Sequence, residues 1–141
     1  MSHSHHHEAT AFLDANILVS AAWKLDSETA KIWKLAGLRL VTSSYVVGEV
    51  QRNLHHISQI ERLRSLMTQV EILTFEDLPA PEELQALPAK DRPVMAAAIK
   101  AGADFLITGD KKHFSQWFGK SVCGVRVEPT TNLIALFPLR T

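Results

Sequence analysis

Short apolar runs alternate with longer amphipathic segments along most of the chain. Five runs have the length and residue types of buried β-strands, at residues 11–14, 38–42, 70–75, 103–110 and 124–130. Apolar residues recur at helical spacing in segments 16–23, 26–38, 45–57, 58–69, 94–102 and 131–137. This alternation predicts an α/β domain, in which helices cover both faces of a parallel sheet.

Two regions fall outside this alternation. Segment 76–93 holds four of the six prolines of the chain, which predicts a loop that carries one short helix. The first ten residues include four histidines and no apolar pattern, so we expect a disordered tail over 1–10 and a single domain over 11–141. The tail histidines can bind metal ions and therefore matter for any metal assay.

Composition limits the environment and the partners. No apolar run approaches the ~20 residues that a membrane-spanning helix needs. The single Cys123 excludes an internal disulfide and fits a reducing compartment, so we expect a cytoplasmic protein without a membrane partner. Lys and Arg total 15, as do Asp and Glu. A nucleic-acid partner would therefore need a local basic patch or bound metal ions to attract it.

Four carboxylates stand at positions that suggest a shared site. Asp14 ends the first predicted strand in "AFLDANILVSAAW", and Asp110 follows the fourth strand in "LITGD". In open parallel sheets, ligands bind outside the carboxyl ends of the strands, where the strand order reverses. Asp91 begins the nearly all-apolar helix, and Glu49 lies in the helix over 45–57.

The helical pattern places Glu49 near the sheet. Its helix has an apolar stripe, and Glu49 falls at the edge of that stripe, from where it can lean over the end of the sheet. The stripe consists of Val46, Val47, Val50, Leu54 and Ile57.

Each acid also has an ordinary explanation when it is taken alone. Asp91 can be a helix N-cap, Asp110 a turn residue, and Glu49 a solvated helix acid. Asp14 is the hardest to explain in this way, because capping accounts for an aspartate but not for the apolar strand that precedes it. Dismissing a shared site requires all four explanations to hold together.

Four acids at one sheet edge would repel one another unless cations neutralised them. Their hard oxygen ligands suit Mg²⁺ or Mn²⁺, and such a site can bind phosphate oxygens and activate water. The core offers no cluster of Cys and His for zinc. The chain also has no phosphate-binding glycine loop and no serine nucleophile elbow.

Four segments together resemble the PIN domain, a fold of metal-dependent ribonucleases. They are "FLDANILVSA", "SSYVVGEVQRNL", "KDRPVMAAAIKAGADFLITGDKKHF" and "VRVEPTTNLIALF". The third is the most specific, and the resemblance spans residues 11–137. Within the family the chain most resembles the toxin components of bacterial toxin–antitoxin systems, the VapC-like ribonucleases. The resemblance implies a three-layer fold whose five parallel strands have the order 3-2-1-4-5.

The resemblance also implies roles for particular residues. Asp14, Glu49, Asp91 and Asp110 become the catalytic, metal-binding acids, with Asn16 and Thr108 in support. Asp14 and Asp91 would hold the main ion, and Glu49 and Asp110 would complete the shell, through water or by holding a second ion. Ala15 stands where the family often has threonine, although that side chain is not a ligand. We interpret Asp104, at the amino end of the fourth strand, as a structural acid.

The implied reaction is hydrolysis of RNA by metal-activated water, leaving 5′-phosphate and 3′-hydroxyl ends. Arg52, Lys111 and Lys112 are candidates for contacts to RNA phosphates, with ordinary surface charge as the alternative. For Trp117 and Phe118, core packing is favoured over stacking on a base. A cognate antitoxin protein and a homodimer are the partners that the family suggests.

Three other functions compete with a nuclease. A catalytically silent PIN-fold binding or regulatory module is the main alternative, although all four acids are retained. A receiver-like phosphoacceptor domain needs an aspartate ending its central third strand, and "VEILTF" has none. A small-molecule enzyme of the same fold class would need a cofactor loop, which is missing.

Overall fold

The computed structural model describes residues 8–24 and 26–141, and its centre is a six-stranded sheet. The order is β3-β2-β1-β4-β6-β5, and all neighbours are parallel except β5 and β6. The strands are β1 (Ala9–Leu13), β2 (Leu38–Ser43), β3 (Val70–Leu73), β4 (Phe105–Ile107), β5 (Ser121–Val122) and β6 (Val125–Glu128). The expected α/β class is confirmed, and the predicted five strands occur in their predicted order as β3-β2-β1-β4-β6.

The predicted strand count was wrong by one, because β5 was not foreseen. This two-residue strand pairs with β6 through a tight hairpin whose turn residues, Cys123 and Gly124, have φ angles of 49° and 86°. Two consecutive residues with positive φ are typical of the turns that join antiparallel strands closely. A strand of two residues is too short to give a pattern of alternating polarity. Cys123 is exposed in this turn.

The middle of the sheet is built from strongly apolar strands. Ala11, Phe12 and Leu13 of β1 have no exposed surface, and neither do Leu106 and Ile107 of β4. β1 and β4 pair in parallel, with Leu13 opposite Ile107. Strands that are buried on both faces must carry side chains of this kind. The two carboxyl ends consequently lie side by side, as the predicted strand order required.

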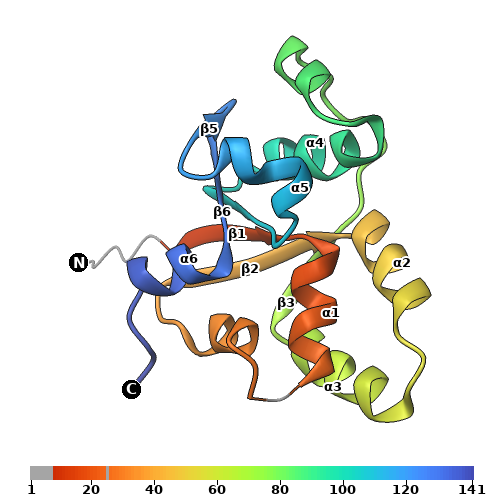
Figure 1. Ribbon diagram of the computed structural model, residues 1–141, viewed down its shortest axis with the longest axis vertical. Coiled ribbons are helices and arrows are strands. Elements are labelled where there is room, and N and C mark those ends of the chain that lie inside the picture. Colours follow the sequence, from red (N-terminus) through yellow and green to blue (C-terminus); the bar gives the residue numbers. More distant parts are fainter. Residues whose placement is uncertain (1–7, 25) are drawn as a thin grey trace.

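Six α-helices and four 3₁₀ helices occur in the described residues. In Figure 1, α1 and α3 lie on one side of the central strands and α4 lies on the other. The α-helices are α1 (Ala15–Trp23), α2 (Ser44–Asn53), α3 (Ile57–Met67), α4 (Arg92–Lys100), α5 (Lys111–Phe114) and α6 (Thr130–Leu136). The 3₁₀ helices are η1 (Thr29–Lys34), η2 (Glu82–Ala86), η3 (Ala89–Asp91) and η4 (Ser115–Trp117).

Two predicted helices differ from the structure. The segment 26–38 forms only the short η1, because Leu35 leaves the helix to form a bridge with Leu139 and Gly37 turns with a φ of 83°. The helix predicted over 45–57 ends at Asn53, and Ile57 instead opens α3 with 73% of its surface exposed. Ile57 is therefore not part of the apolar stripe.

Helix α4 and the loop before it have the predicted character. Five consecutive residues of α4, from Val94 to Ala98, are buried, so this helix is a core element. The proline-rich segment contains η2 and η3 rather than one short helix. The guanidinium of Arg92 donates hydrogen bonds from Nε to the carbonyls of Leu84 and Leu87, at 3.1 and 3.0 Å. These bonds hold the loop against the beginning of α4.

The two ends of the described chain are fixed by strand β1 and by hydrogen bonds of Arg140. Strand β1 begins at Ala9, slightly before the predicted strand, and most of the expected disordered tail falls on residues 1–7, outside the described residues. At the other end, Arg140 donates to the carbonyl oxygens of Lys34 and Trp33, at 2.7 and 2.6 Å. None of the helices described here is both long and apolar enough to cross a membrane.

Candidate metal centre

Asp14 lies where β1 ends and α1 begins, and its carboxylate accepts three hydrogen bonds. Oδ1 accepts from the backbone N–H of Ala15 at 2.7 Å. Oδ2 accepts from the hydroxyl of Thr108 at 2.8 Å and from the side-chain amide of Asn16 at 3.3 Å. The backbone N–H of Asp14 donates to the carbonyl of Ile107 at 3.0 Å. The strand therefore delivers a buried, firmly held carboxylate to the carboxyl edge of the sheet.

Asn16 joins the first turn of α1 to the turn after β4. Its Oδ1 accepts from the backbone N–H of Gly109 at 2.7 Å, and its Nδ2 lies 3.3 Å from the Thr108 hydroxyl. That hydroxyl also accepts from the backbone N–H of Asp110 at 3.1 Å. A Cβ atom on Gly109 would lie 3.3 Å from Oδ1 of Asn16, so this close approach favours glycine. Asn16 and Thr108 thereby position Asp14 relative to Asp110.

Asp91, Asp110 and His113 form a compact group of donor atoms, all within 4.8 Å of one another. The Nδ1 atom of His113 lies 2.9 Å from Oδ2 of Asp91 and 2.9 Å from Oδ2 of Asp110. Asp110 also caps α5, since its Oδ1 accepts from the backbone N–H of His113 at 3.1 Å. Asp91 occupies the N-cap position of α4, but its side chain accepts no capping hydrogen bond. Helix capping therefore does not explain Asp91.

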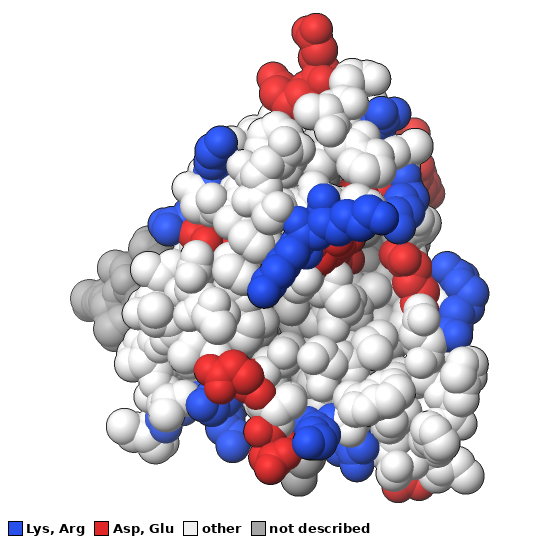
Figure 2. Space-filling view, in the orientation of Figure 1, with Lys and Arg blue, Asp and Glu red and all other residues white. Residues whose placement is uncertain are grey.

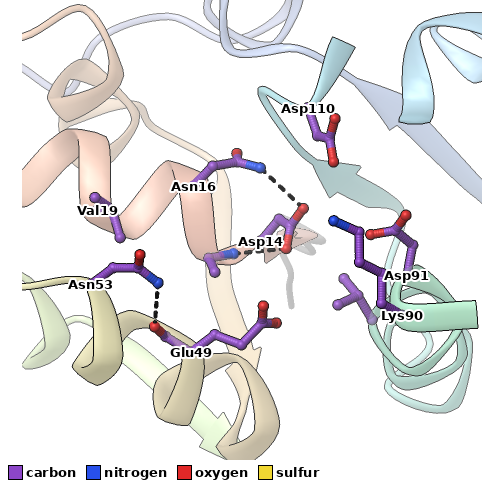
Figure 3. A pocket seen from close by; sticks show the side chains of 10 residues that line it. Asp14, Asn16, Val19, Glu49, Asn53, Lys90, Asp91 and Asp110 are labelled. Carbon is purple, nitrogen blue, oxygen red and sulfur yellow. Dashed lines mark hydrogen bonds between the residues drawn. The ribbon is translucent and has the colours of Figure 1, made fainter. Parts of the chain in front are cut away.

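A cleft at the carboxyl edge of the sheet brings the four predicted acids together (Figure 3). Their carboxylates reach this space from the ends of β1 and β4, from α2 and from η3, and the amine of Lys90 points toward them. The cleft is lined by Asp14, Ala15, Asn16, Val19, Glu49, Asn53, Lys90, Asp91, Val94 and Asp110. The half-buried Glu49 is thus not a freely solvated helix acid.

Burial and mutual repulsion raise the pKa of the two most buried acids of the cleft, Asp14 and Asp91. Burial is the largest cause for Asp14, and the negative charges of Glu49 and Asp91 raise its pKa further above the usual 3.8. Burial is also the largest cause for Asp91, where His113 opposes the increase in pKa and Asp110 adds to it. The carboxylates lie close enough to destabilise one another's charged forms, and a bound cation would reverse this effect.

The donor atoms fit a divalent cation. Oδ2 of Asp91 and Nδ1 of His113 are both buried, yet neither has a hydrogen-bond partner with acceptable geometry, although they lie 2.9 Å apart. Buried polar atoms without such partners are rare in folded proteins and call for an explanation. The carboxylate oxygens of Asp14, Glu49 and Asp110 are the hard ligands that Mg²⁺ and Mn²⁺ prefer.

The three basic residues that were predicted to contact RNA lie outside the lining of the cleft. Figure 2 shows a band of Lys and Arg side chains at the level of α5, with acidic side chains directly beside it. Lys111 and Lys112 are exposed on α5. Arg52 is exposed on α2, and its Nη1 lies over Gly48, 3.8 Å from where a Cβ would be. None of these three predicted RNA contacts lines the cleft, whereas Lys90 does.

The structure gives the other singled-out residues structural roles. Asp104, at the amino end of β4, accepts a hydrogen bond from the backbone N–H of Thr10 at 2.8 Å. Trp117 and Phe118 are half-buried and pack against the hydrophobic core, in agreement with the favoured interpretation.

Three polar or charged residues of the site were missed by sequence reasoning. His113 follows Asp110 by three positions, which places them together only if a helix begins at Asp110, and a four-residue helix leaves no apolar pattern. Lys90 directly precedes Asp91, but lysine is an ordinary surface residue. Asn53 lies one turn beyond Glu49, and that spacing was the one available signal. Its Nδ2 donates to the Glu49 carbonyl at 2.8 Å.

The family match covers the same elements that build this cleft. The family described as "PIN domain" matches residues 10–112, which is more than half of the chain. The chain belongs to the PIN domain family. The matched region of this PIN domain contains Asp14, Glu49, Asp91 and Asp110, whereas His113 lies just beyond it.

Solved structures agree on the fold of the PIN domain. A chain of VapBC2 from Rickettsia felis, bound to a DNA fragment from their promoter, has a TM-score of 0.65 at 20% identity, over 85% of this chain and 98% of that one. A chain of VapBC-1 from nontypeable Haemophilus influenzae has a TM-score of 0.57 at 18% identity, over 86% and 98%. No curated protein sequence matches the chain significantly.

Proposed function

We propose that this PIN domain is a metal-dependent endoribonuclease that hydrolyses RNA phosphodiester bonds. The observation that carries the proposal is the convergence of four carboxylates on one cleft, where β1 and β4 end side by side. The unpartnered Oδ2 of Asp91, whose side chain caps no helix, supports a site built for a cation. The hydrogen bond from Thr108 holds the Asp14 carboxylate in place beside it. A bound Mg²⁺ or Mn²⁺ would polarise the phosphodiester and activate water for attack.

The residues of the cleft divide into two groups. Asp14, Glu49, Asp91 and Asp110 would hold the cation, while Asn16 and Thr108 keep Asp14 and Asp110 in place through their hydrogen bonds. The four acids repel a phosphate, so the RNA backbone can approach them only when cations are bound.

Positive side chains would orient the RNA backbone. The amine of Lys90 points into the cleft and is the nearest candidate for a phosphate contact. Lys111 and Lys112 are exposed directly after Asp110, and Arg52 is exposed one turn beyond Glu49. From these positions they would bind phosphates further along the strand. These contacts position the RNA without reading its sequence.

We further propose that the protein is the toxin component of a toxin–antitoxin system. Two observations support this proposal: the sequence resembles VapC-like toxins, and the fold is shared with chains of two VapBC structures. A cognate antitoxin and a second copy of this chain would then be its protein partners, as the family suggests.

The test is cleavage of a fluorescently quenched single-stranded RNA with Mg²⁺ or Mn²⁺. Replacing His3, His5, His6 and His7 with serine keeps the tail from binding metal. Against this background, the double variant Asp14→Asn, Asp91→Asn is compared with Glu76→Gln, Asp77→Asn, which removes the same charge from exposed loop positions. We expect the cleft variant to lose at least about 100-fold in rate, since a catalytic metal ion contributes several kcal/mol.

The outcomes separate the competing functions. Cleavage that EDTA and the cleft variant both abolish, while the loop variant keeps it, supports the nuclease. Equal cleavage by all three proteins would mean contamination or a misplaced site. Metal binding without cleavage would point to a narrower RNA substrate. A protein that neither cleaves RNA nor binds metal would be the silent binding module instead.

A further inference from the structure

His113 stands beside two of the cleft acids in a geometry that hydrogen bonding does not explain. Its Nδ1 atom lies 2.9 Å from Oδ2 of Asp91 and 2.9 Å from Oδ2 of Asp110. Despite these short distances, Nδ1 has no hydrogen-bond partner with acceptable geometry, and neither has Oδ2 of Asp91. Asp91 is only 9% exposed and its Oδ2 atom is buried, so water does not easily reach this oxygen.

The distances have a simple counterpart in metal coordination. Octahedral Mg²⁺ and ions of similar size have ligand bonds of about 2.1 Å, which puts neighbouring ligand atoms about 3.0 Å apart. The two separations around Nδ1 match that spacing. A ring nitrogen and an oxygen can both point at one cation without pointing at each other, which accounts for the short contact without a hydrogen bond.

We infer that His113 is a ligand of the metal ion, so that the site binds its cation through a nitrogen together with the oxygens of Asp91 and Asp110. This inference rests on the metal site of the proposed function but not on its RNA substrate. The backbone of His113 already fixes Asp110, because its N–H donates to Oδ1 at 3.1 Å. Only the imidazole of His113 is therefore assigned the new role.

An imidazole ligand changes which ion the site prefers. Sites made of oxygen alone suit Mg²⁺, whereas a nitrogen ligand favours transition-metal ions, with affinity rising from Mn²⁺ to Co²⁺ and Ni²⁺. The site should therefore bind Mn²⁺ and Ni²⁺ more tightly than Mg²⁺, and His113 should carry that discrimination.

The alternative role for His113 is that of a counter-ion. A protonated imidazole between Asp91 and Asp110 would neutralise part of their charge in the metal-free protein, and it would leave when a cation enters. The two roles make opposite predictions, because removing a competing cation tightens metal binding whereas removing a ligand weakens it.

The experiment measures binding of Mg²⁺, Mn²⁺ and Ni²⁺ by calorimetry, without RNA. It uses the full chain with the four tail histidines replaced by serine. His113→Ala removes the imidazole, and His113→Gln keeps a polar side chain of similar size in case the alanine variant fails to fold. His56→Ala is the matched control, because His56 is exposed and its side chain makes no capping hydrogen bond.

A second measurement identifies the ligand directly. Pulsed electron paramagnetic resonance of the Mn²⁺-loaded protein detects hyperfine coupling to an imidazole nitrogen. We expect this coupling in the background chain and in His56→Ala, and its loss in both His113 variants. The affinity ratio of Ni²⁺ to Mg²⁺ should fall about tenfold or more when the nitrogen is lost.

Each other result overturns the inference in a distinguishable way. Mn²⁺ binding without nitrogen coupling would show that the acids hold the ion alone. A parallel loss for all three ions would show a structural role for His113. Tighter metal binding in the His113 variants would show that His113 is a counter-ion of the acids. If no ion binds even to the background chain, the metal site of the proposed function fails as well.

Discussion

At the residue scale, the buried carboxylates work against the stability of the metal-free fold. Asp14 accepts three hydrogen bonds, yet burial and the charges of Glu49 and Asp91 still raise its pKa above 3.8. A raised pKa means that the folded state binds the proton more tightly than the unfolded state does. The resulting cost is absent below about pH 3.8, grows as the pH rises, and is complete above the raised pKa of the folded protein.

Because this cost in stability grows with pH, it predicts how the Asp14→Asn variant should behave in EDTA. The free energy of unfolding of the variant, minus that of the wild type, should increase between pH 4 and pH 8, because only the wild type must ionise Asp14. Urea denaturation at several pH values measures the difference. Subtracting the two proteins removes the titrations that they share. A difference that stayed constant with pH would show that Asp14 titrates alike in the folded and unfolded states.

Single residues could be predicted from the sequence only where their surroundings made them unusual. Asp14 was noticeable because an apolar strand leads to it, and Asp91 because an all-apolar helix follows. Their convergence followed from parallel strands ending at one edge. His113 and Lys90 stand among other basic residues, and only the three-dimensional structure shows that they face the acids. No sequence pattern records that a side chain lacks a hydrogen-bond partner.

At the element scale, the beginning of α4 is held by one side chain. The guanidinium of Arg92 donates to the carbonyls of Leu84, Leu87 and Gln85, at 3.1, 3.0 and 3.3 Å. These carbonyls lie at or next to the end of η2, and Asp91 directly precedes Arg92. Arg92 should therefore stabilise the fold and also fix the backbone that carries Asp91.

The substitution Arg92→Ala should lower the free energy of unfolding by about 1.5–3 kcal/mol, the typical range for a hydrogen bond that involves a charged group. It should also weaken Mn²⁺ binding, since Asp91 loses its rigid support. Chemical denaturation and calorimetry measure the two effects. Lys100→Ala removes an exposed charge from the other end of the same helix and should change neither. Unchanged Mn²⁺ affinity in Arg92→Ala would show that η3 and α4 fix Asp91 without the clamp.

Elements were predictable where a long apolar pattern specified them. They were unpredictable where pairing with a distant part of the chain changed the local structure. Strands β1 and β4 and helix α4 are strongly apolar and were located within a few residues. The segment 26–38 looked helical, but its end is drawn out of the helix by pairing between Leu35 and Leu139, which are far apart in the sequence. Long-range pairing of this kind overrides local helical propensity.

At the scale of the whole molecule, the two ends of the sheet use aspartate for opposite purposes. At the amino end, Asp104 accepts a hydrogen bond from the backbone N–H of Thr10 and thereby joins β4 to β1. At the carboxyl end, Asp91 has a carboxylate oxygen without a hydrogen-bond partner and lies beside another acid. One acid stabilises the fold by itself, whereas the other needs a ligand to do so.

This contrast predicts opposite behaviour for two single substitutions. Asp104→Ala should destabilise the metal-free protein by about 1 kcal/mol, the typical value of one hydrogen bond, and should keep its stabilisation by Mn²⁺. Asp91→Asn should cost the metal-free protein less, because it removes a buried charge, but should lose that stabilisation. For the wild type, Mn²⁺ at 100 times its dissociation constant adds about 2.7 kcal/mol.

Thermal and urea unfolding measure the stability of each variant with EDTA and with Mn²⁺. Both variants are made in the background that lacks the tail histidines. The informative value is the gain in stability upon adding Mn²⁺, since it cancels whatever each substitution does to the metal-free fold. A similar gain in Asp104→Ala and in the wild type, together with its absence in Asp91→Asn, would locate cation binding at the carboxyl edge. If Asp91→Asn kept the full gain, the ion would bind elsewhere and the convergence of the four acids would need another explanation.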